Sequence, residues 1–100
     1  MSKRDEYVER MKQQLDEWNA DLERLEIKLS EVSEPVRSKL EPQLSKVRES
    51  YTSARQKLSE VRAAGEESWE DVTDDAEHVW KTLRQSINYF KSQLKRPDQE

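Results

Sequence analysis

The chain has 100 residues with a formal charge of −4, of which 40% are charged and only 32% hydrophobic. So short and polar a chain excludes a thick globular core, and the absence of cysteine excludes disulfide scaffolds and thiolate metal sites. Because 22 acidic residues outnumber 18 basic ones, we also expect no nucleic-acid partner, since phosphate binding needs a basic surface.

Low hydrophobicity with many charges is typical of disorder, but the apolar residues here recur with a strict period. No apolar run approaches the ~18 residues of a membrane span. No apolar segment follows the polar start at residues 2–6, so we predict no signal peptide and a cytoplasmic location.

A first helix is predicted over residues 3–32. Its apolar residues are separated alternately by four and three positions, which is the a/d pattern of a coiled-coil seam. Ser2 and Asp5 fit a capping box at its start. The seam residues of this segment are Met11, Leu15, Trp18, Leu22, Leu25, Leu29 and Val32.

Two prolines, Pro35 and Pro42, interrupt the pattern in the segment 33–42. Each lacks an N–H and disfavours helical backbone in the preceding residue. We therefore expect a hinge here, either as a turn or as a kinked continuation of the helix.

A second helix is predicted over residues 43–64, followed by a tight turn at 65–67. Gly65 is the only glycine and follows the last periodic residue, so we expect it to supply a left-handed C′ position. The seam of this segment consists of Leu44, Val47, Tyr51, Ala54, Leu58 and Val61.

A third helix is predicted over residues 68–95, with Ser68 and Asp71 as a capping box and residues 96–100 as a frayed tail. Its first turns are acidic and its last turns basic, which suits the helix dipole. The apolar stripe is wider here, and it contains Trp69, Val72, Ala76, Val79, Trp80, Leu83, Ile87, Phe90 and Leu94.

These segments predict one all-α domain. Three helices with short connections fit an antiparallel three-helix bundle. The alternative is an extended coiled-coil hairpin, in which the first two segments are nearly continuous and two chains dimerise.

His78, Asp71 and Asp75 form a row on one face of the third helix, which could hold a divalent metal. Zinc usually takes three or four strong ligands, and this row lies opposite the apolar stripe, so we interpret it as a solvated acidic helix start. The chain also lacks a glycine-rich loop for phosphate. We predict a protein that is not an enzyme, with no catalytic, cofactor-binding or metal-binding residue.

The predicted function is therefore binding, through self-association with a dimer favoured, or to another helical protein. Tryptophans on the stripes are interpreted as core residues. The predicted interaction and core seam consists of Leu15, Trp18, Leu22, Leu25, Leu29, Leu44, Val47, Tyr51, Leu58, Trp69, Val72, Val79, Trp80, Leu83, Ile87 and Phe90.

The alternative function is reversible binding to a membrane surface through the amphipathic helix 68–95. Helices of this kind are usually rich in lysine and arginine on their polar face. Here the first half of that face is acidic and would be repelled by anionic lipid, so a membrane partner is possible but not favoured.

Residues 4–19 (RDEYVERMKQQLDEWN) resemble the opening of small bacterial coiled-coil proteins linked to the stress response. Residues 68–72 (SWEDV) and 76–83 (AEHVWKTL) are similar to the second tryptophan-bearing segment of that family. The resemblance implies a cytoplasmic helical protein without an established molecular activity. Pro35 and Pro42 depart from the long charged middle helix of the family.

Overall fold

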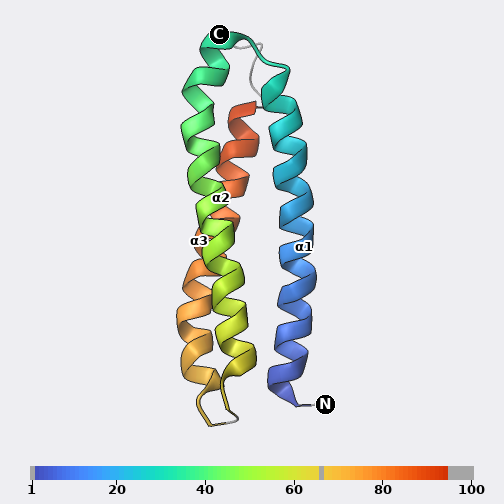
Figure 1. The fold of residues 1–100 in the computed structure, drawn as a ribbon, viewed down its shortest axis with the longest axis vertical. Helices are drawn as coiled ribbons and strands as arrows, with labels where there is room; N and C mark the ends of the chain where they lie inside the picture. Colours follow the sequence, from blue (N-terminus) through green and yellow to red (C-terminus); the bar gives the residue numbers. More distant parts are fainter. Residues whose placement is uncertain (1, 66, 95–100) are drawn as a thin grey trace.

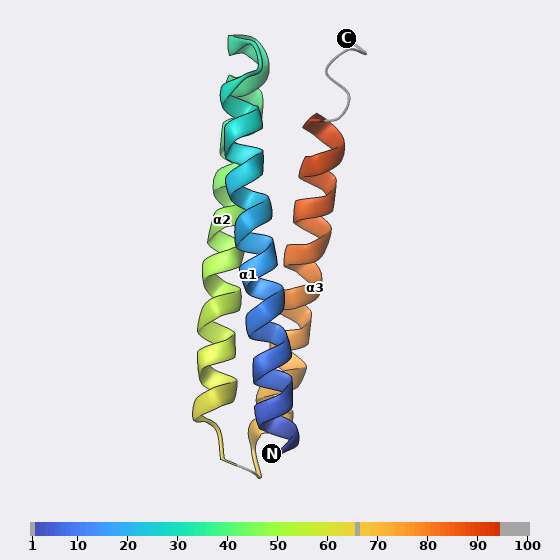
Figure 2. The same ribbon diagram turned by 90° about the vertical axis from the view of Figure 1, so that its right-hand side faces the viewer.

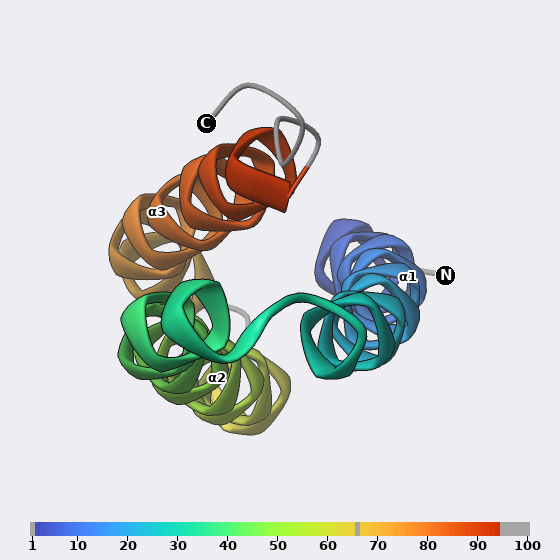
Figure 3. The ribbon, with the colours of Figure 1, turned by 90° about the horizontal axis from the view of Figure 1, so that it is seen from above.

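The computed structural model describes residues 2–65 and 67–94, which contain the helices α1 (Lys3–Ser30), α2 (Glu34–Ala63) and α3 (Trp69–Leu94). Consecutive helices run in opposite directions, so α1 and α3 point the same way and α2 opposes both (Figure 1). Viewed along the long axis, the helices occupy the corners of a triangle (Figure 3). The fold is an all-α three-helix bundle, with principal-axis extents of 52 × 19 × 17 Å.

One continuous cluster of apolar side chains lies between the three helices. Most of the predicted seam residues are buried in it. The exceptions are half-buried and pack against it, and they are Met11, Val32, Trp69, Val72 and Val79. Within the described part of the chain, no polar or charged side chain is buried with them. The stripes that were predicted to seek partners are thus covered by the helices of the same chain.

The first connection is shorter than the predicted hinge and lies before it. α1 ends at Ser30, and α2 begins at Glu34, nine residues earlier than predicted. Pro35 lies in the first turn of α2, where a missing N–H costs no helical hydrogen bond, and Pro42 lies inside the helix. Because Pro42 has no N–H, the Ser38 carbonyl receives no helical hydrogen bond from it. Both residues are exposed, so water can donate a hydrogen bond to the Ser38 oxygen instead.

The second connection differs from the prediction at Gly65. No described glycine has a positive φ, so Gly65 is not a left-handed C′ residue. Instead, α2 ends when Ala64 takes extended backbone with a ψ of 145°. The Gly65 carbonyl then accepts hydrogen bonds from the N–H groups of Ser68 and Trp69, at 3.1 and 3.0 Å, which start α3. The predicted tail at 96–100 lies outside the described residues.

α2 makes the larger contacts in the bundle. It contacts both of the other helices extensively, whereas α1 and α3 share the smallest interface. In the view of Figure 2, α3 is tilted relative to α1 and α2.

Tyr7 joins the first turns of α1 to α3. Its hydroxyl oxygen accepts a buried hydrogen bond from the indole N–H of Trp80, and its ring lies 6.2 Å from that of Trp69. Burial raises the pKa of Tyr7, and the nearby Glu77 carboxylate acts in the same direction. Tyr7 was absent from the predicted seam because it precedes the first regular step of the heptad pattern.

Replacing Tyr7 by phenylalanine is expected to lower the free energy of unfolding by about 1–3 kcal/mol. The ring would stay in place, but the buried Trp80 N–H would lose its acceptor. Urea denaturation followed by circular dichroism measures the change. Tyr89→Phe removes the same hydroxyl from a side chain that is 60% exposed, and an equal loss in that control would contradict our explanation.

Candidate functional site

The predicted row of Asp71, Asp75 and His78 lies on the exposed side of α3. The Asp75 carboxylate is 3.8 Å from the Lys57 ammonium of α2, so it forms a salt bridge between helices. In residues 2–65 and 67–94, no group of three or more histidine, aspartate or glutamate side chains has the geometry to hold a metal ion.

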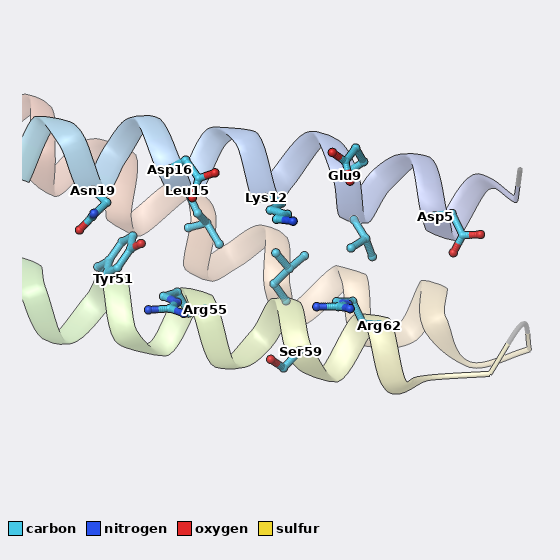
Figure 4. Close-up of a pocket in the computed structure, with 12 residues that line it drawn as sticks. Asp5, Glu9, Lys12, Leu15, Asp16, Asn19, Tyr51, Arg55, Ser59 and Arg62 are labelled. Carbon is cyan, nitrogen blue, oxygen red and sulfur yellow. The ribbon is translucent and has the colours of Figure 1, made fainter.

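A groove of about 700 Å³ lies between α1 and α2 (Figure 4). It runs along the half of the bundle that contains the start of α1 and the end of α2. We call it the α1–α2 groove. It is lined by Asp5, Val8, Glu9, Lys12, Leu15, Asp16 and Asn19 of α1, and by Tyr51, Arg55, Leu58, Ser59 and Arg62 of α2.

The floor of the α1–α2 groove is the outer edge of the core. Leu15, Tyr51 and Leu58 are buried seam residues, and Val8 is half-buried beside them. Most of the exposed surface in the groove is therefore polar. A helix that docked there would gain little apolar burial and would meet mainly charged side chains.

The two walls of the groove carry opposite charge. The α1 wall contains Glu9 and Asp16, whereas the α2 wall contains Arg55 and Arg62. Figure 4 shows Arg55 at the level of Asp16 and Arg62 at the level of Glu9 along the groove. Among the described residues, no ion pair joins these side chains across the groove. Their charges line its two sides without direct contact.

Further along the same pair of helices, an acidic and a basic side chain form an ion pair. Glu26 lies seven residues beyond Asn19 and Arg48 seven before Arg55, which keeps both on the groove side of their helices. The Arg48 guanidinium contacts the two Glu26 oxygens at 2.8 and 2.7 Å. This hydrogen bonding lowers the pKa of Glu26 and raises that of Arg48. Glu26 thus provides a carboxylate at the heptad position that is held by a neutral residue, Asn19, inside the groove.

Other polar contacts between helices are also satisfied within the chain. Arg4 donates to the Ala64 carbonyl at 2.7 Å and fixes the start of α1 to the end of α2. Lys91 of α3 binds the Asp21 carboxylate of α1 at 3.1 Å, which adds an ion pair to the small α1–α3 interface. These contacts hold the bundle together, whereas the charges of the α1–α2 groove do not.

A second groove follows α2 and α3. Its lining is rich in hydroxyl groups and includes His78 and the exposed Tyr89. The charged side chains Lys46 and Glu49 both come from the α2 wall. This surface lacks the opposed charged walls that distinguish the α1–α2 groove.

Comparisons with protein-family models, with curated proteins and with solved structures found no match. The resemblance of residues 4–19, 68–72 and 76–83 to bacterial stress-response proteins therefore stays a prediction. None of the described helices is both long enough and apolar enough to cross a bilayer.

The residues of the α1–α2 groove were missed in the sequence analysis, which followed the apolar seam and not its flanks. The signal was nevertheless present. Glu9 and Asp16 are seven residues apart, as are Arg55 and Arg62, so each pair repeats at one heptad position beside the seam. Arg55 and Arg62 directly follow the seam residues Ala54 and Val61, at the e position, where charge usually sets the choice of partner helix in coiled coils. Glu9 and Asp16 lie at the outer b position.

Proposed function

We propose that this chain is a non-enzymatic interaction protein, which associates through the α1–α2 groove with a second helical surface, most directly a second copy of itself. The observation that carries the proposal is the acidic α1 wall beside the basic α2 wall, with Asp16 level with Arg55 and Glu9 level with Arg62 (Figure 4). The neighbouring Glu26–Arg48 pair supports it, because there an arginine at the heptad position of Arg55 and Arg62 binds a carboxylate.

The burial of the seams changes the kind of association that we propose. Seam leucines cannot serve a partner while they are packed between α1, α2 and α3. Association must then use the polar flanks, where exposed ion pairs each contribute little. We therefore propose a weak and salt-sensitive contact, not a permanent coiled coil.

The alternative, a membrane-surface role for residues 68–95, receives less support. Trp80, Leu83 and Phe90, the large residues of the apolar face of α3, are buried against the other helices. Lipid could reach them only after the bundle opened, at the cost of the core. A role in catalysis is also not favoured, because the shifted pKa of Glu26 is explained by its exposed partner Arg48.

The molar mass in solution, measured by light scattering over a range of concentrations, tests the proposal. At about 0.02 M salt we expect the mass to rise with concentration towards twice the 11.9 kDa of one chain. At about 0.5 M salt, where exposed charges are screened within a few ångströms, we expect it to fall back to one chain. A mass of one chain at every concentration in both buffers would overturn the proposal.

A further inference from the structure

We propose that two copies of the chain pair about a two-fold axis parallel to the long axis of the bundle, so that α1 of each copy lies against α2 of the other. This inference rests on the proposed function and adds the arrangement of the two copies. It follows from the opposite charges of the two walls of the α1–α2 groove.

The direction of the axis decides which walls meet. A two-fold rotation about an axis parallel to the long axis leaves each residue at the same position along that axis. It brings α1 of the second copy opposite α2 of the first, so the acidic wall of α1 meets the basic wall of α2. Rotation about a perpendicular axis in the same interface places α1 on α1 and α2 on α2. Acid would then face acid and base would face base, which suppresses association.

The heights of the charged residues agree with the parallel axis. Within one chain, Asp16 is level with Arg55 and Glu9 is level with Arg62 (Figure 4). Rotation about the long axis therefore sets Asp16 of one copy against Arg55 of the second copy, and Glu9 against Arg62. Symmetry repeats both pairs, so four ion pairs span the interface. Lys12, the basic exception on the α1 wall, is level with the neutral Ser59.

The dimensions of this face suit a dimer of ordinary size. The bundle is 52 Å long and 19 Å wide, and a standard interface needs roughly 800 Å² from each partner. The apolar floor adds little, since Leu15, Tyr51 and Leu58 are already buried. Charge therefore supplies the specificity, and the walls determine which arrangement forms.

Charge reversal of one wall at a time tests this arrangement. Glu9→Arg with Asp16→Arg makes both walls basic, and Arg55→Glu with Arg62→Glu makes both walls acidic. We expect each double variant alone to self-associate at least tenfold more weakly than the wild type. An equal mixture of the two is expected to regain dimers, because each basic wall then meets an acidic one. Glu6→Arg with Glu17→Arg changes the charge equally outside the groove and is expected to leave association unchanged.

Cross-linking distinguishes the two axes. The chain has no cysteine, so Asp16→Cys and Arg55→Cys each introduce a single thiol. With a short bismaleimide, the parallel axis predicts mainly mixed cross-links between the two variants. Cross-links mainly between identical variants would overturn the parallel axis.

The outcomes separate this inference from the proposed function. A wild type that is monomeric throughout overturns both. A wild type that dimerises while both charge-reversed variants dimerise equally well overturns the groove as the interface, and with it both proposals. Loss of association in each variant, with cross-links mainly between identical variants, overturns only the arrangement. Loss of association in each variant, with recovery in the mixture and mixed cross-links, supports both.

Discussion

Replacing Phe90 by alanine is expected to lower the free energy of unfolding by about 3–5 kcal/mol. Phe90 is 1% exposed and is the largest of the fully buried side chains, so the substitution removes a ring from the centre of the core and leaves a cavity. A domain of this size is stable by only about 5–15 kcal/mol. Urea denaturation followed by circular dichroism measures the loss.

The adjacent residue provides a matched control. Tyr89 is an aromatic residue on the same helix, but it is 60% exposed. Tyr89→Ala is expected to change the free energy of unfolding by less than about 0.5 kcal/mol, as surface substitutions usually do. Similar losses for the two variants would mean that α3 does not pack with the face that contains Phe90 inward.

Replacing Pro42 by alanine is expected to raise the free energy of unfolding by up to about 3 kcal/mol. Alanine restores the N–H that can donate to the Ser38 carbonyl and removes the ring from the interior of α2. The greater freedom of the unfolded alanine chain offsets part of this gain. The shift in the thermal unfolding midpoint measures the net effect.

Pro35 serves as the control for this prediction. It lies in the first turn of α2, where its N–H would be unpaired in any case. Pro35→Ala is therefore expected to leave the midpoint nearly unchanged. A gain at residue 35 equal to that at residue 42 would show that position in the helix does not decide the effect.

The sequence predicted the helices and the core well, because burial in a bundle follows the heptad pattern directly. Leu22, Leu83 and Ile87 occupy the seam at regular steps, and all three are buried. The exceptions are at the stripe edges. Trp69, Val72 and Val79 are half-buried because the stripe of α3 is wider than the area that α1 and α2 cover.

The connections were harder to predict because a proline has different effects at different positions. Pro35 and Pro42 both lack a backbone N–H, and their effects on helix stability differ because of their distance from the start of α2. Pro35 lies in the first turn and removes no helical hydrogen bond, whereas Pro42 lies inside the helix and removes one. The place of that start depends on where α1 turns back. A turn at residues 31–33 is stable only if it brings the apolar seams of α1 and α2 together. This depends on packing between helices and not on the residues of the turn itself.

The candidate groove could be predicted only in part. Repetition of charge at Glu9 and Asp16, and at Arg55 and Arg62, is visible in the sequence. Which walls face each other depends on the antiparallel pairing of α1 and α2. The contrast with Glu26 and Arg48 is also visible, because Glu26 lies at the heptad position of Asn19 and not at that of Asp16.

The position of α2 between its two neighbours has a consequence for folding kinetics. Contacts are richest between helices that are adjacent in the chain, and only short connections separate them. Closing such short loops costs little chain entropy, so the bundle belongs with the domains of low contact order that fold in microseconds to milliseconds. Either hairpin can form first, but both require α2. The rate-limiting nucleus therefore includes the middle helix, whichever end of the chain collapses onto it first.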